Sequence, residues 1–396
     1  MIGMGFLAVM ISACVLTLPW TLGAGDDGAP RYNSGTPREA RLSPWWAPKD
    51  ADELLRLNSV VPADDVEAIA AAHGVGVDEV RSATSGQIAR EMRKFHPKPW
   101  LGTDMLGRSL LVRALTGGGI SLGVGLSAAL ISVTIGTLWG TLAAYAGGKT
   151  DALMMRIVDV LYGLPYILLV VLLAVASESV VNEYINRTKA RESWVINQVR
   201  ELAPPGVDTR RGSVLAYLGR PEQEELAATL RAESVQRYKE RVVSPRKRTL
   251  MDVMTLVVAI GGVSWLTMAR VVRGQVLSLK GQPFVEAARA IGANPVRIFR
   301  RHLLPNLLGP IIVYATLTAP QAILQESFLS FLGIGVKPPL PSWGNLAAEG
   351  LSEVNLYRSH WWLLFFPCLL LGVTLLALNF VGEGLREAFD PKRARK

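Results

Sequence analysis

The sequence contains only two cysteines, Cys14 and Cys368, and four histidines among its 396 residues. Both cysteines stand in apolar stretches near opposite ends of the chain, so no disulfide framework is expected. The histidines are scattered without the spacing of metal ligands, which predicts no metal site. No group of residues is typical of a catalytic centre or of a bound cofactor, so the chain is not expected to be an enzyme.

A nucleotide-binding loop is missing as well. The tetrapeptide GGKT at 147–150 resembles the end of one, but Ala143 stands where the pattern needs a glycine, and an apolar stretch precedes it instead of a strand. GVGLSA, which begins at Gly123, imitates a dinucleotide fingerprint inside an apolar stretch. These glycines, like the GxxxG pair Gly136 and Gly140, are better suited to close helix packing. If the chain pumps a solute, its energy therefore has to come from an external source.

The hydrophobic residues, 50% of the chain, are gathered in long blocks. A helix needs about 20 mainly apolar residues to cross the hydrocarbon core of a membrane. Six blocks are candidates, and they are Ile2–Leu22, Leu122–Tyr145, Ile157–Ala176, Met251–Val271, Leu307–Leu332 and Trp361–Val381. The sequence therefore predicts an all-α, polytopic membrane protein with six transmembrane helices.

The net charge of +9 comes mainly from cations beside these blocks, which is typical of topology determinants rather than of a nucleic-acid surface. Residues 272–306 hold six Lys or Arg and one acid, and the tail 384–396 is also basic. Because cytoplasmic loops carry an excess of Lys and Arg, both segments are expected inside the cell, and six spans then place both termini there. The first block lacks a preceding basic region and is longer than a usual signal-peptide core, so we expect a retained span.

Two long polar stretches are expected on the outer side of the membrane. The first opens with a loop and continues with helical patterns after Pro62, which predicts a small helical subdomain and an amphipathic helix before the second span. We interpret the second as another helical insertion rather than as a catalytic domain. The predicted segments are a first span at 1–22, an outer region at 23–119, spans two and three at 120–181, an outer insertion at 182–250, spans four to six at 251–383 and a cytoplasmic tail at 384–396.

The segment EAARAIGANPVRIFRRHLLPN lies between the fourth and fifth spans. Its first part, Glu286–Ile291, has high helix propensity, and Gly292 interrupts it. Asn294 and Pro295 suit the start of a second short helix, which we expect Pro305 to end. A basic helix–turn–helix of this kind either docks a cytoplasmic partner or lies along lipid headgroups, and its residues alone do not choose between these.

The same segment resembles the EAA loop of ABC-importer permeases, and the matching residues are Glu286, Ala287, Ala288, Gly292 and the pair Leu304 and Pro305. Two further segments follow the family in order. LGTDMLGRSLLVRAL at 101–115 is similar to the segment before its second span, and ESFLSFLGIGVKPPLPSWGNLAAEG at 326–350 to the signature after its fifth. With the terminal NFVGEGLREAFDP, they identify the chain as a member of the C-type permease subunits of dipeptide and oligopeptide importers. The resemblance implies the type I ABC-importer permease architecture.

The resemblance also implies a function and partners. The chain would pair with a second homologous permease subunit in a bacterial inner membrane, form half of a pathway for peptides, and receive cargo from an extracytoplasmic substrate-binding protein. Two ABC ATPases would bind the EAA loop, while its arginines contact membrane lipids or partner acids. The implied coupling residues are Glu286, Ala287, Ala288, Arg289, Gly292 and Pro305. An importer of another cargo, such as nickel, a sugar or an antibiotic peptide, stays open, as does a membrane-anchored sensor or scaffold.

Several single residues are candidates for particular roles. Charged groups inside spans are few, so Glu326 and Asp159 are candidates for lining the pathway. The alternative is that each reaches the interface or pairs within the bundle, for example Asp159 with Arg156. Trp343, in a loop stiffened by prolines, is a candidate contact for the substrate-binding protein or a simple interfacial aromatic. Thr103 is expected to cap the helix that leads into the second span.

Overall fold

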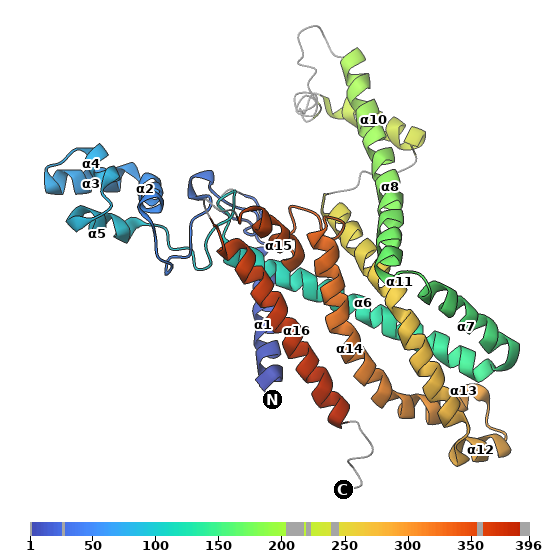
Figure 1. Ribbon diagram of the computed structural model, residues 1–396. Coiled ribbons are helices and arrows are strands. Elements are labelled where there is room, and N and C mark those ends of the chain that lie inside the picture. The colour runs from blue at the N-terminus through green and yellow to red at the C-terminus, as the bar shows by residue number, and fades with distance from the viewer. Residues whose placement is uncertain are drawn as a thin grey trace. The chain divides into compact units, whose positions relative to one another are not determined.

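The structure, a computed structural model, describes residues 2–25, 28–202, 218, 223–238, 245–354 and 359–388. Over these residues the chain is helical, and extended segments pair only in isolated bridges (Figure 1). The all-α prediction is therefore confirmed. The chain divides into two compact units, one formed by Met1–Val170 with Leu256–Lys396 and the other by Val171–Thr255.

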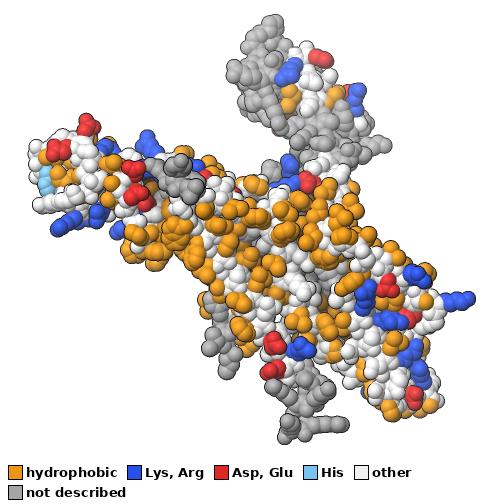
Figure 2. Space-filling model, in the orientation of Figure 1, with side chains coloured by type: hydrophobic (Ala, Val, Ile, Leu, Met, Phe, Trp, Pro, Cys, Tyr) orange, Lys and Arg blue, Asp and Glu red, His pale blue; other side chains and the backbone are white. Residues whose placement is uncertain are grey.

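Four helices within the described residues are long and apolar enough to cross a membrane. They are α6 (Leu110–Ala146), α11 (Pro245–Lys280), the continuous helix Pro295–Phe331 that ends as α14 (Leu304–Phe331), and α16 (Trp362–Ala388). These helices correspond to the second, fourth, fifth and sixth predicted spans. Figure 2 shows apolar side chains spread over the middle of the first unit, as expected for helices that face lipid.

The third predicted span is not a single long helix, and the first is described only in part. In α1 (Ile2–Thr21), the apolar part found, Leu7–Thr21, is shorter than a typical span. The third is divided between α7 (Gly148–Tyr162) and α8 (Tyr166–Leu202), which meet at 92°. Pro165 explains the break, because it has no N–H and biases the residue before it away from helical geometry. If the bent pair is one span, the described residues contain up to five, so the predicted six is not confirmed.

The helices of the first unit pack around α6 and α16. Both contact α1, α14 and the short helix α15 (Trp343–Ser352). The start of α1, the end of α16, and the short helices α12 (Pro283–Ala290) and α13 (Pro295–Ile298) lie towards one end of the long helices, while α15 lies towards the other (Figure 1). The two ends of the first unit therefore carry different short helices.

Two glycines of α6 lie where α11 leaves no room for a side chain. A Cβ on Gly136 would stand 2.5 Å from the Cβ of Met268, and one on Gly140 would collide with the carbonyl oxygen of Ala269. Real Cβ atoms do not approach that closely in a packed interior. The prediction that this GxxxG pair lets two helices approach closely is confirmed.

We expect Gly140→Leu to force α6 and α11 apart and to destabilise the protein by about 1–3 kcal/mol, the usual range for overpacking. Gly123→Leu is the matched control, because it makes the same change in the same helix where the surrounding space is open. The measurement is the midpoint of thermal unfolding of the purified chain in detergent. Equal midpoints for the two variants would contradict the tight crossing.

The first polar stretch contains a 3-10 turn (Pro37–Glu39) and four short helices, α2 (Ala51–Val60), α3 (Ala63–His73), α4 (Val77–Ser82) and α5 (Gly86–Phe95). Asp50 caps α2 by accepting the N–H of Glu53 at 2.7 Å, and Gly74 ends α3 in the left-handed conformation. Their small apolar core consists of Val61, Val66, Ile69, Ala70, Val80 and Met92. These helices form a small cluster within the first polar stretch, while its standing as an external subdomain stays a prediction.

The second unit contains most of α8 and the helix α10 (Glu224–Tyr238). Its apolar cluster consists of Val195, Ile196, Val199, Leu218, Ala227 and Leu230. Both polar stretches therefore contain helices, while their place on the outer side of the membrane stays a prediction. Residues 389–396 of the predicted tail lie outside the described residues.

The expected helix at 101–115 is wrong over its first half. α6 begins at Leu110, with Ser109 at its N-cap. Thr103 is not a cap, because it lies in a turn and pairs with Ser109 in an isolated bridge. Gly102 and Gly107 have φ values of +88° and +74°, which a right-handed helix cannot contain. The two glycines therefore delay the helix by two turns.

Candidate functional site

The helix α12 ends in a Schellman motif at Gly292. The N–H of Ala293 donates to the carbonyl of Ala288 at 3.0 Å, and the N–H of Gly292 donates to the carbonyl of Arg289 at 2.9 Å. Gly292 has a φ of +78°, a conformation that costs an L residue about 1–2 kcal/mol. The space around it is open, so the backbone conformation and not crowding requires glycine here.

Asn294 starts the next helix. Its side chain accepts the N–H of Val296 at 3.1 Å, and Pro295 occupies the first helical position. The break and the restart predicted from the sequence are both confirmed. Hydrogen bonds fix the end of α12 and the start of α13, so the turn between them is a defined structure.

Pro305 does not end this helix, contrary to expectation. α13 continues through a π-helical turn, η3 (Phe299–Leu303), directly into α14. In this turn the N–H of Leu304 donates to the carbonyl of Phe299, five residues back. π-helical geometry is rare and occurs mostly as single turns inside α-helices, as it does here. α13 is therefore joined to a spanning helix without a loop.

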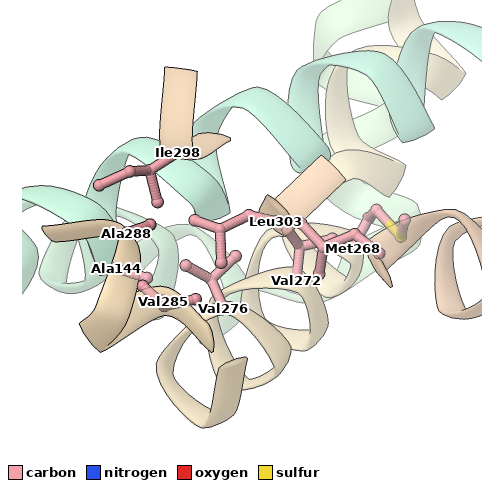
Figure 3. Packing of buried hydrophobic residues seen from close by; sticks show 9 residues of the cluster. Ala144, Met268, Val272, Val276, Val285, Ala288, Ile298 and Leu303 are labelled. Atoms are coloured by element: carbon pink, nitrogen blue, oxygen red, sulfur yellow. The ribbon is translucent and has the colours of Figure 1, made fainter. Parts of the chain in front are cut away.

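The two alanines of the EAA sequence differ in exposure. Ala288 is only 5% exposed and belongs with Val285 to a cluster that includes Ile298 of α13 and Val276 of α11 (Figure 3). This packing holds α12 against the ends of two long helices. Ala287 is exposed. Of the two, Ala287 is available to a partner, whereas Ala288 positions α12.

The exposed side of this segment carries large apolar side chains among charged ones. Ile291 is 85% exposed and Val296 is 62% exposed. Glu286, Ala287 and Arg289 are exposed beside them, and we call these five residues the coupling surface. Figure 2 shows Lys and Arg gathered at this end of the unit. An apolar centre with a charged rim is typical of protein interfaces. Sequence reasoning missed Ile291 and Val296, although apolar residues on either side of a glycine turn were a usable signal.

Ionic contacts fix α7 and the end of α6 to α11 at the same end. Arg273 donates from Nε and Nη2 to the two carboxylate oxygens of Asp151, at 2.6 and 2.7 Å. Lys280 donates from Nζ to the carbonyls of Ala144 and Tyr145, both at 3.1 Å. Charge-assisted bidentate pairs of this kind have a fixed geometry. These contacts attach α11, the helix that precedes α12, to α6 and to α7.

Asp159 is exposed and pairs within the bundle, as the alternative reading expected, but its partner is Arg270 and not Arg156. The distance from Arg270 Nη2 to the carboxylate is 2.8 Å. The guanidinium of Arg270 also lies 3.9 Å from the ring centroid of Tyr162, a cation–π contact. Tyr162 lines a groove between α7, α8, α11 and α14, so Asp159 lies beside that groove.

A groove of about 340 Å³ runs between α7, α8, α11 and α14. The Tyr166 hydroxyl donates to the side-chain oxygen Oε1 of Gln325 at 2.6 Å and lies 2.8 Å from the Ser264 hydroxyl. The lining residues are Leu161, Tyr162, Leu164, Tyr166, Leu169, Val263, Leu266, Thr267, Gln321 and Gln325. Uncharged amide and hydroxyl groups among apolar side chains suit a neutral polar solute.

Glu326, expected as a possible pathway residue, is fully buried in this conformation. Its carboxylate accepts the hydroxyl of Ser330 at 2.7 Å and that of Ser327 at 3.3 Å. Ser121 of α6 and Ser342 at the start of α15 also hydrogen-bond to it. A buried polar group needs such partners. Glu326 therefore joins three helices instead of lining the groove.

Trp343, expected as a possible contact for a binding protein, is fully buried. Its Nε1 donates to the carbonyl of Ala114 at 3.0 Å, and its main-chain N–H donates to the hydroxyl of Ser121 at 3.3 Å. A Cβ on Gly118 would stand 2.6 Å from the ring, so this glycine makes the space for it. The direct-contact hypothesis is wrong for this conformation, because the ring attaches α15 to α6.

An ionic cluster that sequence reasoning missed lies at the start of α6. Arg113, which is 2% exposed, donates from Nη1 to Asp104 and to Glu349, each at 2.6 Å. Its Nη2 donates to the second oxygen of Glu349 at 3.0 Å, and Arg108 donates from Nε to Asp104 at 2.7 Å. Asp104 and Glu349 are 245 positions apart in the sequence (349 − 104). No local pattern indicates such a contact.

Long apolar helices, a groove between them and an exposed helix–turn–helix at one end are the features of a membrane-embedded transport permease. Comparison with known proteins gives the family. Residues 136–395 match the family described as the binding-protein-dependent transport system inner membrane component, and the chain belongs to this family.

Individual relatives agree with this assignment. The chain is 38% identical over 296 residues to the dipeptide transport system permease protein DppC of Bacillus subtilis, which covers 75% of this chain and 69% of the relative. It is 38% identical over 304 residues to the oligopeptide transport system permease protein OppC of Escherichia coli, covering 77% and 75%. For OppC of Haemophilus influenzae the identity is 37% over 304 residues, covering 77% and 73%.

Proposed function

We propose that this chain is a permease subunit of an ATP-driven importer of dipeptides or oligopeptides. The observation that carries the proposal is the coupling surface, which is exposed, rigid and continuous with a spanning helix. Relatives named as dipeptide and oligopeptide transport permeases supply the cargo class. Separate ABC ATPases bind the coupling surface, and an extracytoplasmic binding protein delivers the peptide.

In this proposal the chain contributes half of the pathway, and a second homologous permease contributes the other half. The groove at Tyr166 and Gln325 is the part of the pathway wall that this chain supplies. Its amides and hydroxyls replace water around peptide bonds without holding one side chain tightly, which suits a cargo of varied sequence. ATP binding closes the ATPases, moves α12 and α13 with α14, and opens the groove alternately to each side.

The topology follows from the same proposal. Six crossings, with α1 and the bent pair α7 and α8 each counted as one, place both termini in the cytoplasm of a bacterium and the two polar stretches outside. The coupling surface, the start of α1 and the end of α16 lie towards one end of the first unit (Figure 1). Both ends of the chain on one side support an even number of crossings. The cations of 272–306 support placing that end inside.

The test is reconstitution. The chain is co-expressed with a homologous permease, two ABC ATPases and a binding protein from the same genome, and the complex is placed in liposomes. We expect ATPase subunits to co-purify with the chain, and peptide uptake to require ATP and binding protein. A complex that forms but takes up nickel or sugar instead of peptide would overturn the cargo. Failure of the chain to retain any ATPase would overturn the importer proposal itself.

A further inference from the structure

A second pocket, of about 360 Å³, lies between the loop that precedes α2 and the end of α5. Three cations line it, Lys49, Arg93 and Lys98, and no acid is among the described lining residues. Lys49 Nζ lies 3.5 Å from the carboxylate of Glu53, which is not among the lining residues. The described lining residues therefore carry a surplus of positive charge. The pocket therefore suits an anion.

The walls of this pocket place it at the depth of the membrane surface. Trp45 is one of them, and its ring meets that of Trp100 edge-on at 6.3 Å. The neighbouring Trp46 lies 6.3 Å from Trp361, which directly precedes the spanning helix α16. All four tryptophans are exposed. Tryptophan concentrates where hydrocarbon gives way to headgroups. The pocket thus opens beside the point where α16 enters the membrane.

We propose that this pocket binds the phosphate of an anionic phospholipid headgroup, with the exposed tryptophans inserted among the surrounding lipids. Cations beside interfacial aromatics are the usual chemistry of a headgroup site. The concave shape favours one phosphate over the flat acidic surface of a protein. The site holds the α2–α5 subdomain against the membrane. It requires only that α16 spans the membrane, and so it is independent of the importer proposal.

The state of His96 agrees with an unneutralised positive pocket. Burial, followed by the charges of Lys49 and Arg93, lowers the pKa of this imidazole to about 4. His96 is therefore neutral at pH 7, with its Nε2 2.9 Å from the side-chain oxygen of Asn58. A bound phosphate offsets the two cations and raises this pKa towards the ordinary value of about 6.5.

Native mass spectrometry of the purified full-length chain tests the proposal, with phosphatidylglycerol and phosphatidylcholine titrated separately. We expect one tightly retained phosphatidylglycerol and no equivalent phosphatidylcholine. In Arg93→Gln with Lys98→Gln, retention should weaken about 30-fold, the expected effect of removing two cations from an anionic headgroup. Arg90→Gln with Lys94→Gln is the matched control, because it removes the same charge from exposed positions of α5 that do not line the pocket.

Three results would overturn the proposal. Equal weakening in both double variants would mean diffuse attraction without a site. Equal retention of the two phospholipids would remove the role of the anion. Inorganic phosphate that displaces phosphatidylglycerol at equal molar concentration would identify a soluble anion as the ligand. If the glutamine variant does not fold, Arg93→Lys with Lys98→Arg still decides, because the proposal requires retention to stay within about threefold when charge is kept.

Discussion

Replacing Ile291 by aspartate is expected to release the ATPases from the permease while leaving the permease folded. The side chain is 85% exposed in the isolated chain, so the substitution disturbs few internal contacts. In an interface the same position becomes buried, and a carboxylate there loses its water without gaining a partner. Loss of about 2 kcal/mol or more, as at an interface hot spot, corresponds to about 30-fold weaker ATPase binding. Peptide uptake is expected to fall at least as far.

Val77→Asp is the matched control for this prediction. Val77 is an exposed valine of α4, 39% exposed, in the helical subdomain away from the coupling surface. The same apolar-to-acid change there should leave ATPase retention unchanged. The measurement is the amount of ATPase that co-purifies with each variant over a range of salt concentrations. Unaltered retention by Ile291→Asp would show that α12 and α13 do not form the contact.

Replacing Arg113 by leucine is expected to give the largest loss of stability. The guanidinium is almost fully buried between Asp104 and Glu349, and removing it leaves Glu349 without its two-pronged partner and Asp104 with Arg108 alone. Breaking a buried ionic cluster from one side typically costs about 3–5 kcal/mol. The midpoint of thermal unfolding in detergent should fall clearly. Arg113→Lys should lie between, because lysine keeps the charge but not the two-pronged geometry.

Two comparisons separate this effect from simple loss of an arginine. Arg38→Leu removes an exposed guanidinium and should change stability by no more than about 0.5 kcal/mol. The double variant Arg113→Leu with Glu349→Gln should be more stable than Arg113→Leu alone, because it also removes the carboxylate that loses its two-pronged partner. If the double variant is no more stable, the unpaired Glu349 carboxylate is not the cause of the loss.

Local signals in the sequence predicted most of the helices and the form of the coupling turn. Apolar blocks of spanning length located four long helices, because burial in lipid requires such blocks. Gly292 and Asn294 were interpreted correctly, because a left-handed residue and a side-chain cap act within a few residues. The errors at Thr103 and Pro305 were also local. Two glycines with positive φ delayed one helix, and a π-helical turn carried another past its proline.

The surroundings of the candidate residues were beyond prediction from the sequence. Trp343 and Glu326 were expected near the outer surface, yet both are buried because α6 supplies Gly118 and Ser121 from more than 200 positions away. The contact between Arg113 and Glu349 was not predicted, because nothing in their own segments requires a partner. Residues of this kind are recognised only when the contacting segment is known.

The sequence by itself determined that the chain is helical, that it enters a membrane, and that a basic broken helix lies between two spans. These properties depend on composition and on interactions within a few residues, so the amino-acid order contains them directly. Only the tertiary structure decided which alanine of the EAA sequence is buried, which groups face the groove, and that Ile291 and Val296 stay exposed. Exposure of a side chain depends on which distant helices pack beside it, and helix packing is fixed by the fold as a whole.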